Sequence, residues 1–204
     1  MQKCNKDLLI LRKNCCKLVK VRRMMVKKII KHIVLVSKHK WQVFKLCVRV
    51  GMPWRGLVHD LSKFSWTEFS ESVKYYTGTH SPIKECRKNN GYSQAWIHHK
   101  AKNKHHYEYW LDFYPEPRPV IIPYKYVAEM ICDRIAAGKV YEGKDWNQEE
   151  PLKYFLKERE KNILMHEQVA KVLEEVFTQV KDNGINKTLK KKNLKAVYKK
   201  YCEN

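Results

Sequence analysis

Histidines are concentrated in the first half of this sequence, where their arrangement suggests metal chemistry. Eight of the nine His lie in residues 32–106, and one of them forms the dipeptide His59-Asp60. An adjacent imidazole and carboxylate can both reach one cation where the backbone turns at the end of a helix. Neutral imidazole and ionised carboxylate suit a divalent first-row transition metal. The dipeptide is therefore the first candidate for a metal site.

Two further residues extend this candidate site. His39 lies 20 residues before His59, on an expected helix, and Asp133 lies in a largely apolar helical segment. Carboxylates are rarely buried without a partner. That partner is a metal ion, the neighbouring Arg134, or Lys63 from another segment.

The third element is a histidine cluster in residues 96–110. On one continuous helix His99, Asn103 and His106 share a face, and His105 lies on the adjacent strip. Imidazoles two turns apart are separated by about 10 Å along the axis, too far for one ion. They could flank a phosphate, bind a second metal or act as a general acid. The alternative is a polar, solvent-exposed face.

The ordered set of His39, His59-Asp60 and Asp133 resembles the H…HD…D pattern of the HD-domain superfamily. That superfamily is all-helical and consists largely of metal-dependent phosphohydrolases. The resemblance implies that these four residues bind one divalent ion, and that the later histidines occupy the region of a second metal site. The motif departs from its usual form because Ser62 replaces a glycine.

A closer resemblance covers residues 30–180. It is to an uncharacterised bacterial and phage family whose members are often labelled "catalase", although no residue here supports haem peroxide chemistry. The matching segments are His39-Lys40-Trp41, His59-Asp60-Leu61-Ser62-Lys63-Phe64-Ser65, Trp96-Ile97-His98-His99, Asn103-Lys104-His105-His106-Tyr107-Glu108-Tyr109-Trp110 and Glu129-Met130-Ile131-Cys132-Asp133.

These resemblances imply hydrolysis of a nucleotide or another phosphate ester at a Mn, Fe, Co, Ni or Zn site. We expect His99 or His106 to protonate the leaving group and Glu129 to orient a metal ligand. The expected phosphate and substrate contacts are Lys63, Arg55, Lys100, Asn103 and His105.

The elements that must position these residues all read as helices. Helical periodicity predicts helices over about 27–50, 65–76, 94–112, 124–141, 152–163 and 167–180, with a short helix or turn at 54–60 and a loop at 78–91. Ser65 and Glu68 are typical of a capping box. The predicted fold is an all-α, HD-domain-like bundle with basic terminal extensions.

The formal charge of +21 is unevenly distributed. Residues 1–40 carry +12 and residues 181–204 carry +6, whereas the long central part is close to balanced. The expected divisions are a basic, helical or partly ordered extension over 1–26, the helical domain over 27–180 and a basic tail over 181–204 that could form a short helix. Basic ends favour loose, salt-sensitive contact with nucleic acid or anionic lipid, or they form a solvated surface.

Cysteine usage and hydropathy suggest a cytoplasmic protein. The seven Cys form no CxxC pair, which argues against a disulfide framework, and no apolar run is long enough for a transmembrane helix. Cys47 and Cys132 are expected in the core. Two functions remain as alternatives to a hydrolase: a non-catalytic metal-containing module that binds nucleic acid through its basic ends, and a metal-dependent oxygenase on the same scaffold.

Overall fold

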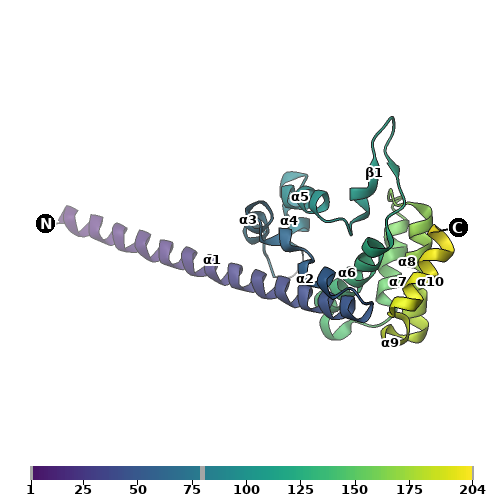
Figure 1. Cartoon of the computed structure of the whole chain (residues 1–204). Helices are drawn as coiled ribbons and strands as arrows, with labels where there is room; N and C mark the ends of the chain where they lie inside the picture. The colour runs from purple at the N-terminus through teal and green to yellow at the C-terminus, as the bar shows by residue number, and fades with distance from the viewer. Residues whose placement is uncertain (1, 79–80, 204) are drawn as a thin grey trace.

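The computed structural model describes the backbone of residues 2–78 and 81–203, with side chains from residue 20 onward. The chain is all-α apart from one short hairpin (Figure 1). Its larger helices are α1 (Gln2–Arg49), α3 (Trp66–Lys74), α4 (Pro82–Asn90), α5 (Gln94–Lys102), α6 (Tyr124–Glu142), α7 (Glu150–Arg159), α8 (Glu167–Asn183) and α10 (Lys191–Cys202). The shorter ones are α2 (Pro53–Val58), η1 (Leu61–Phe64), η2 (Tyr107–Trp110), η3 (Gly143–Asp145) and α9 (Ile185–Thr188).

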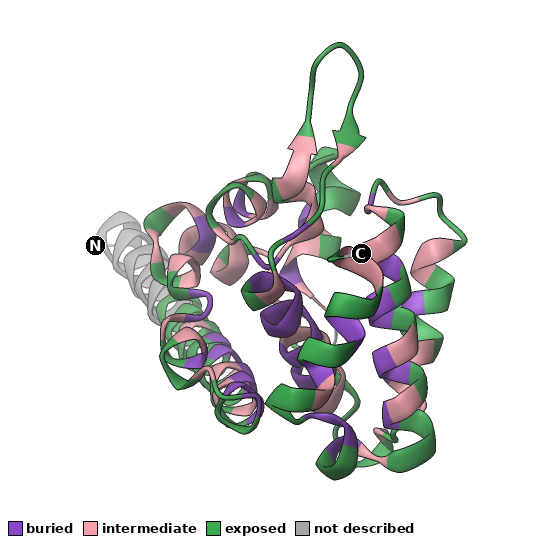
Figure 2. Ribbon diagram, turned by 45° about the vertical axis from the view of Figure 1, so that its right-hand side comes forward, coloured by how far each residue is buried: buried purple, intermediate pink, exposed green. Residues whose placement is uncertain are grey.

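The core lies where α1, α6, α8 and α10 meet. Helix α6 packs along the C-terminal half of α1, and α8 packs against α7 and α10. Inward-facing residues are buried while the outer faces are exposed (Figure 2). The expectation that Cys47 and Cys132 are core residues is confirmed, since both are fully buried.

Helix α1 is longer than the expected 27–50. It continues without a break from residue 2, and its N-terminal half projects away from the rest of the fold (Figure 1). Its C-terminal half supplies the core residues Val43 and Leu46. The apolar repeat that predicts the packed part therefore marks only the section that touches the domain.

The C-terminal segment is part of the packed domain, although its basic composition suggested a tail beginning at residue 181. Leu189 and Leu194 are almost fully buried, and the Tyr198 hydroxyl donates to the Ile122 carbonyl at 2.9 Å. The lysines of α10 occupy the outward face of an amphipathic helix, which explains why composition misplaced the boundary.

Two expectations about local structure are wrong. The predicted loop at 78–91 contains α4, which has Pro82 in its first turn and ends at Gly91 with φ +80°. The predicted helix over 94–112 ends at Lys102, and the chain continues through η2 into strand β1 (Leu111–Asp112), which pairs antiparallel with β2 (Arg118–Pro119). The second correction is important because it places histidines of the predicted helix on non-helical backbone.

Hydropathy is low throughout the helices. Within the described residues, no helix combines the length and apolar character needed to cross a bilayer.

Candidate metal centre

The His59-Asp60 dipeptide lies on the turn between α2 and η1. Asp60 adopts a left-handed conformation, with φ 53° and ψ 31°, which Asp tolerates better than most residues. The Lys40 amine donates to the His59 carbonyl and ties the turn to α1. Both side chains of the dipeptide are consequently buried, with exposures of 1% and 2%.

The structure brings together the four residues of the H…HD…D pattern. His39 comes from α1 and Asp133 from α6, and their Nε2 and Oδ1 atoms are 2.9 Å apart. His59 Nε2 lies 3.3 Å from Asp60 Oδ2 and 3.4 Å from Asp133 Oδ1. One ligand atom from each of the four residues lies within 4.8 Å of those from the other three. This first ligand group therefore has the size of a site for a single ion.

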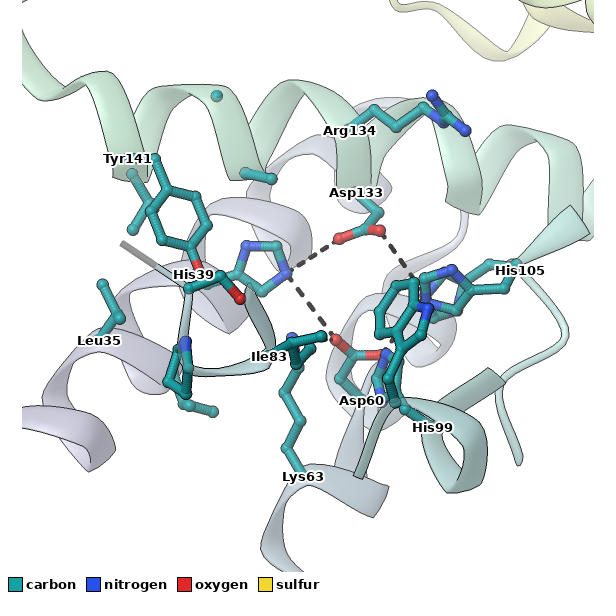
Figure 3. Close-up of a pocket in the computed structure, with 18 of the residues that line it drawn as sticks. Leu35, His39, Asp60, Lys63, Ile83, His99, His105, Asp133, Arg134 and Tyr141 are labelled. Carbon is teal, nitrogen blue, oxygen red and sulfur yellow. Dashed lines mark ion pairs between the residues drawn. The ribbon is translucent and has the colours of Figure 1, made fainter. Parts of the chain in front are cut away.

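A second ligand group shares Asp60 with the first. It consists of Asp60, His99, His105 and His106, again with candidate ligand atoms within 4.8 Å of one another. His99 Nε2 and His105 Nε2 each lie 3.4 Å from Asp60 Oδ1, whereas the first group faces Asp60 Oδ2 (Figure 3). The two oxygens of one carboxylate thus face two sets of imidazoles, and His105 Nε2 also lies 3.7 Å from Asp133 Oδ2 of the first group.

The second group exists because the helix stops at Lys102. Asn103 has extended dihedral angles, and its amide donates to the His99 carbonyl at 2.8 Å and to Ser62 Oγ at 2.7 Å. The backbone leaves the helical path there, so His105 and His106 turn towards Asp60. Asn103 thus has a structural role in which Ser62 on η1 is its partner, and its contact with substrate stays a prediction.

Two glutamates accept hydrogen bonds from the Nδ1 atoms of the imidazoles, on the side away from Asp60. Glu129 Oε1 lies 3.0 Å from His59 Nδ1 and 3.5 Å from His105 Nδ1. Glu68 lies 2.8 Å from His99 Nδ1 and 2.7 Å from His98 Nδ1. A carboxylate that accepts from Nδ1 leaves the Nε2 lone pair directed at the metal position.

Sequence reasoning identified Glu129 but missed Glu68 as a site residue. The capping-box interpretation is half right, because the Glu68 backbone N–H donates to Ser65 Oγ while the Glu68 side chain turns to the histidines. Only the tertiary contact between α3 and α5 distinguishes the two uses of this glutamate.

Although Glu129, His59 and His105 also lie close enough to hold an ion, we assign Glu129 to hydrogen bonding. Its Oε2 is 2.5 Å from the Arg55 guanidinium, and its Oε1 faces the two Nδ1 atoms. Both oxygens of Glu129 therefore already have hydrogen-bonding partners.

The ionisable side chains of this cluster shift one another's pKa values. Burial alone would raise the pKa of Asp60, but His59, Lys63 and His99 lower it well below its ordinary value. Burial would likewise raise the pKa of Asp133, but His39 and His59 hold it well below its ordinary value. Burial, together with His105 and His99, lowers the pKa of His106 well below that of free histidine. These shifts favour the ionised form of both carboxylates and the neutral form of His106, the forms that bind metal. Burial would lower the pKa of His59, but Asp60, Asp133 and Glu129 raise it well above its ordinary value.

The donor atoms are better arranged to bind a metal ion than to form hydrogen bonds with one another. The buried Nε2 atoms of His59, His105 and His106 and the Asp60 Oδ1 atom have no aligned hydrogen-bond partner among the described residues. A buried polar atom left unsatisfied costs about 1–3 kcal/mol. Imidazole nitrogens and carboxylate oxygens converging in this way match the preferences of divalent transition metals.

The centre forms part of the lining of a pocket of about 620 Å³. Among the described residues, the Lys and Arg side chains that line the pocket are Lys63 and Arg134. Arg134 is paired with Glu158 at 2.5 Å. Lys63 Nζ lies 2.6 Å from Asp60 Oδ2. Apolar and aromatic side chains form much of the remaining wall, including Leu35, Val36, Ile83, Tyr141, Trp146 and Tyr154.

Two expected phosphate contacts lie outside the pocket lining. Arg55 pairs with Glu129 and covers the Tyr126 ring at 4.3 Å. Lys100 lies 3.6 Å from Glu108 and extends over the Trp96 ring. Of the cations singled out in the sequence, the structure brings Lys63 to the centre.

Among the comparisons with known proteins, only the one with family profiles found a match. Neither curated protein sequences nor solved structures gave a significant match. Residues 28–179, which contain every candidate ligand, match the profile of a family of unknown function, DUF5662. The match covers most of the chain, so this protein belongs to the DUF5662 family.

Proposed function

We propose that this protein is a metal-dependent phosphohydrolase of the HD-domain type, acting on a nucleotide or another phosphate ester. The observation that carries the proposal is the shared position of Asp60 between two groups of imidazole ligands beside a pocket. The order of His39, His59-Asp60 and Asp133 along an all-α chain supports the same scaffold.

Divalent ions bound here would supply a nucleophile at neutral pH and polarise a phosphoryl oxygen. The first ion would be held by His39, His59, Asp60 and Asp133, and the second by Asp60, His99, His105 and His106. Glu68 and Glu129 keep the ligand rings oriented.

Lys63 is the residue best placed to act on the substrate. Although burial lowers the pKa of Lys63, Asp60 and Asp133 raise it above the ordinary lysine value, so the amine stays charged. It lines the pocket next to Asp60 and can neutralise charge on a phosphoryl oxygen.

The expected role of His99 as a proton donor to the leaving group is revised within this proposal. Its Nδ1 is engaged by Glu68 and its Nε2 faces Asp60, so both ring nitrogens are occupied. The Nε2 of His106 belongs to the same ligand group. The same reasoning moves His105 from the substrate contacts to the ligands.

Pocket chemistry favours a phosphomonoester over a polyphosphate. A triphosphate needs several cations, and beyond the proposed ions the described lining offers only Lys63 and an Arg134 already paired with Glu158. The apolar and aromatic wall suits the organic part of the ester.

The test is phosphate release from a panel of nucleoside monophosphates and other phosphomonoesters, after loading with Mn, Fe, Co, Ni or Zn. We expect metal-dependent release that Asp60→Asn lowers by at least about 1,000-fold, since the variant loses a charge shared by both groups. His166→Ala is the control, because His166 caps α8 away from the site and is absent from the ligand groups.

Metal retention by the wild type without phosphate release from any substrate would overturn the hydrolase assignment. Oxygen consumption by the iron-loaded protein, measured in parallel, would instead support an oxygenase on this scaffold. If Asp60→Asn retained its full metal content, the proposed centre itself would be wrong.

A further inference from the structure

Helix α1 has three distinct faces over the part whose side chains are described. One face packs into the domain through buried residues such as Val36, Val43 and Cys47. The other two are exposed, one apolar and the other basic, and the metal centre uses neither. Both faces begin on the section of α1 that projects from the domain and continue along the section that packs against α6 (Figure 1).

The exposed apolar face is a stripe of six side chains, and the exposed Arg23 and Ser37 lie in the same sector of the helix. At about 100° per residue, its members fall within about 100° of the helix circumference, away from the core-facing side. Each is a large apolar side chain in contact with solvent, and Trp41 is 58% exposed. We call this set the outer apolar stripe: Val26, Ile30, Ile33, Val34, Trp41 and Val48.

Helix α2 adds to this exposed apolar surface. Gly56 fits closely against Phe44, so α2 lies beside the stripe, and Phe44 stacks on Trp41 at 5.6 Å. Trp54 is 72% exposed on α2, and Leu57 is exposed as well. Exposed aromatic and aliphatic side chains thus gather around the C-terminal part of the stripe.

The third face is positively charged. Its members occupy only about 40° of the helix circumference and extend over about 43 Å of axis. All are exposed, and none forms an ion pair with another described residue. We call this set the basic stripe: Lys20, Lys27, Lys31, Lys38, Lys45 and Arg49.

No acidic residue balances the basic stripe locally. The sequence has no Asp or Glu between Asp7 and Asp60. The centres of the two stripes are about 90° apart around the axis, so both can touch the same flat surface. Such a surface must accept apolar side chains and carry negative charge.

We propose that α1 lies lengthwise on an anionic lipid surface. The outer apolar stripe enters the boundary between headgroups and acyl chains, and the basic stripe contacts the lipid phosphates. An amphipathic helix with Lys and Trp in these positions binds membranes in this way without spanning them.

Two other occupants fit the observations less well. Nucleic acid would use the cations, but it would leave Val26, Ile30 and Val34 without a role. A second copy of this chain could cover the apolar stripe, but it would bring two basic stripes together without acidic partners.

The experiment is flotation of the full chain with vesicles of phosphatidylcholine alone or mixed with phosphatidylglycerol. We expect the wild type to float with the mixed vesicles and to bind phosphatidylcholine much more weakly. The triple variant Lys27→Ala, Lys31→Ala, Lys38→Ala should lower the partition coefficient by about 100-fold, because each lysine near an anionic surface contributes about fivefold.

The matched control is Lys157→Ala, Lys161→Ala, Lys181→Ala, which removes the same charge from exposed positions outside α1. It should bind mixed vesicles within a few-fold of the wild type. The variant Ile30→Ser, Val34→Ser, Trp41→Ser should also lose binding, although it keeps every cation. Circular dichroism checks that all variants retain their helices.

Three results would overturn the proposal. They are no flotation of the wild type with mixed vesicles, equal losses in the stripe and control lysine variants, or unchanged vesicle binding by the serine variant. Retardation of duplex DNA or RNA that the serine variant retains, without vesicle binding, would assign the basic stripe to nucleic acid. Concentration-dependent dimerisation lost in the serine variant, again without vesicle binding, would assign the apolar stripe to a second copy.

Discussion

At the scale of single residues, the candidate centre depends on which nitrogen of each histidine is free. Glu68 and Glu129 accept from Nδ1 of His99 and His59, so the Nε2 atoms face Asp60. A neutral imidazole has one N–H and one lone pair. The glutamates therefore determine the ligand atoms as well as the ring orientation.

Replacing Glu68 by Gln should weaken one ligand group while sparing the other. Glu68 contacts His98 and His99 and does not touch the ligands of the first group, so affinity for one ion should fall by about 10–100-fold. Titration of the metal-free protein with Mn or Co, followed by calorimetry, separates the two binding steps.

Glu71→Gln is the matched control, because Glu71 lies one turn later on α3 and accepts from Ser93 Oγ and Ala95 N at the start of α5. It should leave both affinities unchanged. Equal loss in the two variants would mean that Glu68 acts only by fixing α3 to α5.

At the scale of elements, the site depends on where helices end. The α2–η1 turn places Asp60, and the end of α5 at Lys102 turns His105 and His106 inward. Both breaks are stabilised by side chains from other elements, namely Lys40 for the first and Ser62 for the second. A continuous helix at either point would remove ligands from the centre.

The packing of α10 on α8 should depend on pH. Glu175 Oε2 accepts from Lys200 Nζ at 2.6 Å and from Tyr201 Oη at 2.7 Å. Burial raises the pKa of Glu175, but Lys200 and Tyr201 lower it below the ordinary 4.5. A depressed pKa contributes stability that is present above 4.5 and is lost as pH falls through the folded-state value.

Glu175→Gln should therefore lower the free energy of unfolding at neutral pH, by an amount that shrinks below about pH 4.5. Urea unfolding across this range measures the difference. Glu174→Gln, one residue earlier and exposed, is the control for removing a carboxylate from α8 without breaking the contacts to Lys200 and Tyr201. A constant difference for Glu175→Gln at all pH values would mean that its ion pair contributes nothing.

At the scale of the whole molecule, the ligands connect segments distant in sequence. His39 comes from α1, His59 and Asp60 from the α2–η1 turn, His99 from α5, and Asp133 from α6. Ions bound by these groups would cross-link elements that otherwise meet through packing. Metal binding should consequently be visible as global stability.

Adding a bound metal at about 100 times its dissociation constant should stabilise the fold by about 2.7 kcal/mol. For a chain of this length that raises Tm by about 5–10 °C. Thermal unfolding of the metal-free protein with and without Mn or Co measures the shift. Asp60→Asn should abolish it, whereas an equal shift in that variant would place the bound metal elsewhere.

Sequence patterns determined the all-α class and most helix positions, because helical periodicity is a local property. Ligand chemistry singled out His39, His59, Asp60 and Asp133, whose candidate ligand atoms lie within 4.8 Å of one another. Composition could not show that 181–204 packs into the domain, since a basic amphipathic helix has the same composition as a solvated tail. The sequence also could not show whether the Glu68 side chain completes the cap of α3 or contacts His99. Only the tertiary structure decided that α5 stops at Lys102, because the hydrogen bonds from Asn103 to Ser62 and to the His99 carbonyl outweigh a continuous helical pattern. The same break brings the later histidines to Asp60 and creates the second ligand group.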